Sequence, residues 1–130
     1  MKILFYDTKS YDRDFFEKLL PSYPGIEIKF IEANIHEETA ALAHGYDAIC
    51  AFVNADLGAP VIEELHRQGV KLILMRCAGY NNVDLETTAK CGIQVARVPG
   101  YSPEAVAEHA MALALTANRH THKAYIKCRE

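Results

Sequence analysis

Strand-like and helix-like segments alternate along the whole chain, and three of the strand-like segments are continuous apolar runs. These runs occupy residues 3–6, 48–53 and 72–75. Continuous apolar runs are typical of strands that are covered on both faces, as in a parallel sheet. Strands separated by helices at this spacing are joined by right-handed crossovers. The sequence therefore predicts an α/β fold with a five-stranded parallel sheet flanked by helices.

The two remaining strand-like segments are more polar, which places them at the edges of the sheet. Residues 26–30 alternate apolar and charged side chains, and Gln94 and Arg97 interrupt the segment 93–98. With these segments at the edges, the predicted strand order is 2-1-3-4-5, which is the flavodoxin-like arrangement. Sheets of this kind bind ligands beyond the carboxyl ends of their strands.

Hydrophobic periodicity and turn residues set the expected bounds of the elements. The strands are expected at residues 2–7, 26–33, 47–53, 71–77 and 93–98, and the helices at 12–20, 34–44, 60–68, 84–92 and 103–127. Phe15, Phe16, Leu19 and Leu20 are expected to form the apolar face of the helix at 12–20. Asn34 and Asp84 are expected to cap the helices that follow them.

The composition narrows the class of function. Apolar residues make up 50% and charged residues 24% of the 130 residues, as in soluble globular proteins. A net charge of −3 provides no basic surface for nucleic acid. No apolar run approaches the ~20 residues that cross a bilayer. The chain also lacks a signal-peptide pattern and a Cys-x-x-Cys pair. We therefore expect a cytoplasmic protein with no disulfide and no nucleic-acid or membrane partner.

Two segments carry the candidate chemistry. Residues 76–84 read Arg-Cys-Ala-Gly-Tyr-Asn-Asn-Val-Asp and follow the fourth predicted strand. The glycine lets a ligand approach the backbone, and successive N–H groups bind anions. From the residues alone, this segment is either a carboxylate or phosphate site or a plain structural turn. Residues 98–109 read Val-Pro-Gly-Tyr-Ser-Pro-Glu-Ala-Val-Ala-Glu-His, which indicates a sharp junction before the last helix.

The last predicted helix, residues 103–127, is apolar around most of its circumference. One stripe contains Val106 and Leu113, and a second stripe beside it contains Met111. A helix of this kind is covered on more than one side. We therefore expect a second domain or another chain to pack against it.

Together the two segments resemble the D-isomer-specific 2-hydroxyacid dehydrogenases, most closely the D-lactate dehydrogenases, and the resemblance runs from Met1 to Glu130. It implies a flavodoxin-like substrate-binding domain at residues 1–101, followed by the first helix of a truncated NAD-binding Rossmann domain at residues 102–130. It also implies the reversible reduction of pyruvate to D-lactate with NADH. The helix at 103–125 would then contribute to a homodimer.

The resemblance also assigns roles to individual residues. The backbone N–H groups of Ala78 and Gly79 would bind the carboxylate of a small 2-oxo or 2-hydroxy acid. Tyr101 would offer its hydroxyl to the same carboxylate, and Phe52 would pack against the side chain of the substrate. Val106 would lie near the nicotinamide of NAD. The structural alternatives are a tight turn at Ala78 and Gly79, a core aromatic at Phe52, a packing residue between domains at Tyr101 and a core helix position at Val106.

The sequence departs from the family at its reaction centre. The His, Glu and Arg that perform the family's chemistry and the glycine-rich NAD fingerprint belong to the later domain, and His109 matches a structural position. We therefore expect no catalytic residue, no metal site and no activity from this chain alone. The alternative is a free-standing flavodoxin-like domain that binds a ligand or dimerises without redox activity.

Overall fold

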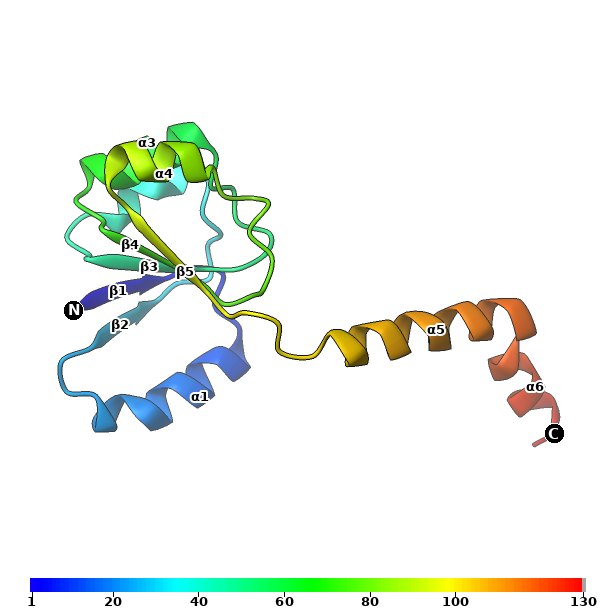
Figure 1. The fold of residues 1–130 in the computed structure, drawn as a ribbon. Helices are drawn as coiled ribbons and strands as arrows, with labels where there is room; N and C mark the ends of the chain where they lie inside the picture. The colour runs from blue at the N-terminus through cyan, green and yellow to red at the C-terminus, as the bar shows by residue number, and fades with distance from the viewer. Residues whose placement is uncertain (130) are drawn as a thin grey trace. The chain divides into compact units, whose positions relative to one another are not determined.

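The computed structural model describes residues 1–129, which form two compact units (Figure 1). The first unit is Met1–Pro99 and contains the whole sheet, and the second begins at Gly100. The assignment of these units to a substrate-binding domain and the start of a cofactor domain stays a prediction.

The first unit is built on a five-stranded parallel sheet in the order β2-β1-β3-β4-β5, as predicted. The strands are β1 Lys2–Phe5, β2 Glu27–Phe30, β3 Ala48–Ala51, β4 Leu72–Met75 and β5 Gln94–Arg97. Ile49 of the central strand lies opposite Leu4 of β1 and Ile73 of β4. Every residue of β3 is buried, which explains its continuous apolar sequence.

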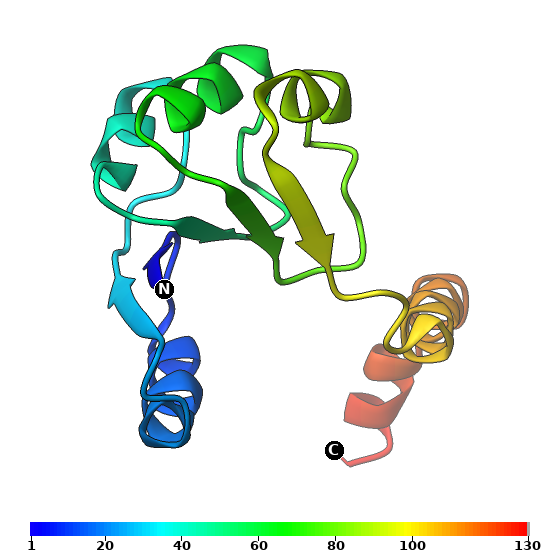
Figure 2. The same ribbon diagram turned by 60° about the vertical axis from the view of Figure 1, so that its left-hand side comes forward.

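Helices cover the two faces of the sheet unequally (Figure 2). The helices α2 Glu37–Ala40, α3 Ala59–Arg67 and α4 Leu85–Cys91 lie on one face, and α1 Ser10–Leu19 lies on the other. The helix α3 inserts Val61, Ile62 and Leu65 into the main core, where all three are fully buried.

The ends of α4 follow from two residues. Asp84 accepts a hydrogen bond from the N–H of Thr87 at 3.0 Å, so its predicted role as the N-cap is confirmed. The same hydrogen bond holds the pKa of the Asp84 carboxyl below its ordinary value. Gly92 ends the helix with a φ of 68°, in the left-handed region that glycine adopts without strain.

One expectation for the other helices is wrong. Asn34 does not cap α2, which begins three residues later and has its first turn closed by Thr39, whose Oγ1 accepts from the N–H of His36. The Asn34 side chain binds the backbone of Asn54 instead. In α1, Phe15 of the predicted apolar face is 69% exposed.

Phe16 is the aromatic residue of α1 that packs on the sheet. Its ring lies 5.1 Å from that of Phe5 on β1 and 6.5 Å from that of Phe30 on β2. The helix is therefore anchored over β1 and β2, and none of its residues is fully buried.

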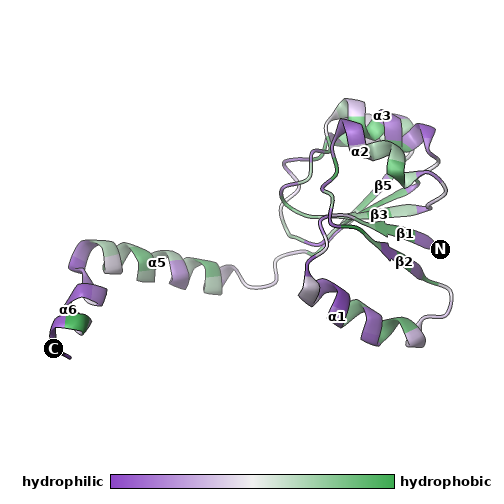
Figure 3. Ribbon diagram, turned by 180° about the vertical axis from the view of Figure 1, so that it is seen from behind, coloured by the Kyte–Doolittle hydropathy of each residue, from purple (hydrophilic) through white to green (hydrophobic). Residues whose placement is uncertain are grey.

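The second unit contains two helices where the sequence predicts one. The first helix, α5, runs from Pro103 to Arg119, and α6 from Thr121 to Lys127. His120 separates them because its φ of 52° is left-handed, although its N–H still donates to the carbonyl of Thr116. Apolar residues recur along α5, yet none of its side chains is buried (Figure 3).

Candidate anion-binding site at the carboxyl edge of the sheet

The loops that follow β3 and β4 lie side by side at the carboxyl edge of the sheet. The Asn82 side chain donates to the carbonyl of Ala55 at 2.9 Å and to that of Phe52 at 3.5 Å. Beside it, Leu57 and Val83 form a parallel bridge. Phe52 and the loop that contains Ala78 and Gly79 therefore share one edge, which a common pocket requires.

The peptide groups at Ala78 and Gly79 have their carbonyls engaged and their N–H groups free. Arg97 donates to the carbonyl of Ala78 at 2.9 Å, and the thiol of Cys77 donates to that of Gly79 at 3.3 Å. Within residues 1–129, the N–H groups of Ala78 and Gly79 reach no acceptor. Two adjacent free N–H groups on a restrained loop are suited to an anion such as a carboxylate.

Glycine at position 79 keeps the space beside this loop open. A Cβ added to Gly79 meets no atom within 4 Å, and its φ lies outside the left-handed region. The glycine is therefore not required by a strained turn. It leaves room for a ligand to reach the backbone.

Phe52 follows β3 and is partly buried, in agreement with the core alternative considered for it. One part of its ring packs against the main core of the first unit. The guanidinium of Arg76 lies over the ring, 4.9 Å from its centroid. The ring of Phe52 therefore lies between the core and the guanidinium of Arg76 at the carboxyl edge.

Arg76, which follows β4, bonds at this edge to the residues after β1 and to α1, a role that sequence reasoning missed. Its Nη1 donates to the Asp12 carboxylate at 2.6 Å, and its Nη2 donates to the carbonyls of Tyr6 and Asp7 at 2.9 and 2.8 Å. The guanidinium also lies over the ring of Phe5. The available signal was an arginine directly after a buried apolar run, since a buried charge needs partners.

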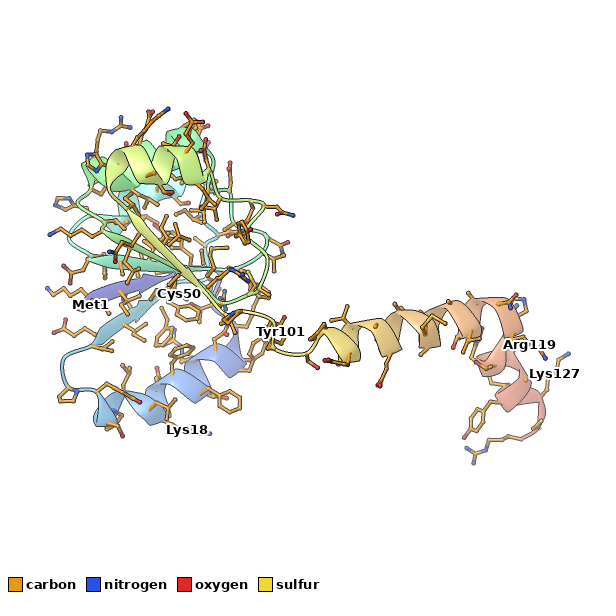
Figure 4. All side chains as sticks on the ribbon, in the orientation of Figure 1. Met1, Lys18, Cys50, Tyr101, Arg119 and Lys127 are labelled. Carbon is orange, nitrogen blue, oxygen red and sulfur yellow. The ribbon has the colours of Figure 1, made fainter. Side chains whose placement is uncertain are left out.

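Tyr101 and Val106 belong to the second unit. Tyr101 precedes α5 and is 69% exposed, and Val106 lies in the first turn of α5 and is 67% exposed (Figure 4). Their roles toward substrate and NAD stay predictions.

The described residues were also compared with the requirements of a metal site, a membrane-spanning helix and a disulfide. In the described part of the chain, no three His, Cys, Asp or Glu side chains gather as metal ligands. No helix among residues 1–129 has the length and apolarity to cross a membrane. Cys50, Cys77, Cys91 and Cys128 are unpaired with one another. Burial raises the pKa of the Cys50 thiol to about 12, so this thiol stays protonated at neutral pH.

Comparison with known proteins places the chain in a family. Residues 3–129 match the family described as D-isomer specific 2-hydroxyacid dehydrogenase, catalytic domain. The chain belongs to this family.

Individual relatives agree with this placement. D-lactate dehydrogenase from Escherichia coli strain K12 is 47% identical over 130 residues, which are 100% of this chain and 39% of that protein. The solved apo-structure of D-lactate dehydrogenase from Escherichia coli has a TM-score of 0.81 and covers 99% of this chain and 40% of that one.

A more distant solved structure contains ligands. It is D-lactate dehydrogenase from Aquifex aeolicus complexed with NAD and lactic acid, which is 29% identical with a TM-score of 0.71 and covers 88% of this chain and 33% of that one. The chain thus spans about two-fifths of the length of the curated relatives that it matches.

Proposed function

We propose that residues 1–99 bind the substrate carboxylate within an NAD-dependent D-lactate dehydrogenase, which interconverts pyruvate and D-lactate. The observation that carries this proposal is the pair of free N–H groups at Ala78 and Gly79, on the same edge of the sheet as the partly buried ring of Phe52. Two N–H donors match the two oxygens of a carboxylate, and each hydrogen bond to a charged acceptor is stronger than a neutral one.

The neighbouring residues orient the substrate and limit its size. With the carboxylate on the loop, the methyl group of pyruvate packs against Phe52, and a larger side chain would have to displace this ring. The Tyr101 hydroxyl provides a further donor to the carboxylate, and Val106 lies against the nicotinamide. The support for these two roles is the resemblance of residues 98–109 to the family.

The residues present do not fit the main part of an NAD site. None of the seven glycines forms a Gly-x-Gly-x-x-Gly motif, which binds the pyrophosphate of a dinucleotide. The cofactor supplies the hydride in this reaction, and the protein supplies binding and orientation. We therefore assign binding and orientation to this chain and no step of hydride or proton transfer.

The expected inactivity of the chain alone has a direct test. Mixed with NADH and pyruvate, the 130-residue chain should leave the nicotinamide absorbance unchanged. Steady loss of that absorbance, above a sample without protein, would contradict the proposal that the reacting groups lie elsewhere.

The binding role is tested by removing one N–H group. Gly79→Pro deletes the donor, whereas Gly79→Ala keeps it and adds a Cβ where nothing lies within 4 Å. Calorimetric titration with oxamate, an isostere of pyruvate, should show binding to the unaltered chain and to Gly79→Ala. Binding to Gly79→Pro should be at least about ten-fold weaker.

Two results would count against the binding role. Equal affinity of the proline and alanine variants would show that the Gly79 N–H group is not used. A third variant, Asn81→Pro, changes the same loop two residues later, and an equal loss there would indicate general disruption of the loop.

A second copy of this chain is the partner that we propose for α5. The support is a set of large apolar side chains in this helix that are more than half exposed, namely Val106, Met111, Leu113 and Leu115. Exposed apolar surface of this extent is typical of protein interfaces. Homodimerisation through residues 103–125 and the cytoplasmic location are both proposals.

A further inference from the structure

Arg97 contacts the candidate carboxylate loop although it lies on another strand. It is the last residue of β5 and lies opposite Met75 of β4 in the sheet. From there its Nη1 reaches the carbonyl of Ala78 at 2.9 Å, and its guanidinium lies 5.1 Å from the centroid of the Tyr80 ring. The Arg97 side chain therefore contacts the residue before Gly79 and the residue after it.

The hydrogen bond from Arg97 fixes the direction of the Gly79 N–H group. The carbonyl of Ala78 and the N–H of Gly79 belong to one planar trans peptide, so they point in opposite directions. Holding the carbonyl toward Arg97 turns the N–H away from it. A charged donor on the carbonyl also polarises the peptide and makes the N–H a better donor.

Arg76 has carboxylates close to its guanidinium, and Arg97 does not. Arg76 has the Asp12 carboxylate at 2.6 Å and Asp7 at 4.0 Å. Among residues 1–129, no carboxylate lies within 4.0 Å of the Arg97 guanidinium. Arg97 is thus the cation at this loop whose charge is left to act on an incoming anion.

We propose that Arg97 is a positioning residue of the carboxylate site. It holds the peptide between Ala78 and Gly79 with the N–H group directed to the substrate, and its uncompensated charge favours an anionic ligand. This inference rests on the proposed carboxylate-binding role of the loop and adds a specificity for anions that depends on β5.

The test compares the unaltered 130-residue chain with Arg97→Met, Arg97→Lys and Arg67→Met. Methionine keeps the length of the side chain but removes the donor and the charge. Lysine keeps the charge and one donor. Arg67→Met is the matched control, because it removes one arginine from α3, where the partner is Glu64. Circular dichroism of each variant verifies that it folds.

The first readout needs no ligand. The amide ¹⁵N shift of Gly79 reports the hydrogen bond on the preceding carbonyl, so it should move upfield in Arg97→Met. It should lie between the two values in Arg97→Lys and stay unchanged in Arg67→Met. An unchanged Gly79 shift in Arg97→Met would overturn the positioning role.

The second readout is the affinity for oxamate, measured by calorimetry. Arg97→Met should bind about ten-fold more weakly, Arg97→Lys should recover most of the loss, and Arg67→Met should equal the unaltered chain. Equal binding by Arg97→Met and the unaltered chain would overturn the inference. If the unaltered chain binds no oxamate, the proposed function fails instead, and the Gly79 shifts still decide whether Arg97 positions the peptide.

Discussion

The first unit, residues 1–99, and the second unit, from residue 100, have similar apolar content but use it in opposite ways. In the first unit, apolar side chains of the sheet and of α3 are fully buried, with Leu4, Ile49 and Leu65 among them. In the second unit, no residue of α5 or α6 is buried. The first unit therefore gains stability from its own contacts, whereas the second has no core within the described chain.

This difference shows which functional groups the chain can position by itself. In the first unit, Arg97 holds the peptide that carries the Gly79 N–H group, and the Val98 N–H holds the peptide that carries the Ala78 N–H group. Tyr101 and Val106 are exposed in a unit without a core. The loop at residues 78–79 is thus held by contacts within the first unit, whereas Tyr101 and Val106 have no such contacts.

The largest expected effect is on the free energy of unfolding, and it is measured with one leucine-to-alanine substitution in each unit. Leu65→Ala, in the main core, should lower the free energy of unfolding by about 3 kcal/mol. Leu115→Ala, on α5, should change the free energy of unfolding of the first unit by less than about 0.5 kcal/mol. Urea unfolding followed by circular dichroism measures both. A loss from Leu115→Ala as large as that from Leu65→Ala would contradict the contrast between the units.

The second-largest expected effect comes from a substitution at the carboxyl edge of the sheet, and it tests whether side-chain contacts there stabilise the first unit. Arg76→Met leaves the Asp12 carboxylate and the carbonyls of Tyr6 and Asp7 without their donor, so the free energy of unfolding should fall by about 2 kcal/mol. The exposed Arg13→Met is the control and should cost under about 0.5 kcal/mol. Urea unfolding again provides the measurement, and equal costs would show that the Arg76 contacts contribute little.

A charged residue placed on α5 tests whether the apolar face of this helix is the surface through which two copies of the chain associate. Leu113→Glu should weaken self-association of the chain at least about ten-fold, because it places a carboxylate in the apolar face. The unfolding of residues 1–99 should stay unchanged. Sedimentation equilibrium measures the association, and an unaltered monomer–dimer distribution would exclude this face as the interface.

The smallest effect concerns the helix caps. Asp84 caps α4, whereas Ser102 makes no side-chain hydrogen bond to α5. Because the pKa of Asp84 is lowered in the folded state, its contribution is present above its ordinary pKa and is lost as the pH falls through the lowered value. The stability advantage of the unaltered chain over Asp84→Ala should therefore shrink between about pH 5 and pH 2 in urea unfolding. A constant difference would refute this linkage.

Much of the first unit follows from local pattern in the sequence. The strand order was predictable because apolar runs and alternating segments distinguish central from edge strands, and Asp84 and Gly92 mark the ends of α4. The break at His120 was not, since a left-handed histidine has no strong local signal. The exposure of Phe15 was not predictable either, because a periodic apolar face does not tell which member reaches the sheet.

In the candidate site, too, some residues could be identified from the local sequence and others could not. Ala78 and Gly79 are candidates because of their place after a buried strand and because of the family resemblance, and their role stays a prediction. Arg76 and Arg97 were not assigned roles, because their partners lie on strands and loops far away in the sequence. Asp12 is 64 residues from Arg76, and Ala78 is 19 residues from Arg97.

The most direct test of the account maps where the substrate carboxylate binds. In ¹H–¹⁵N spectra of the 130-residue chain titrated with oxamate, the largest changes should fall on the amides of Ala78 and Gly79, with smaller ones at Phe52. The amides of α3, on a covered face of the sheet, should remain unchanged. Changes that centre on another part of the first unit, or an absence of change at Ala78 and Gly79 up to saturating oxamate, would contradict it.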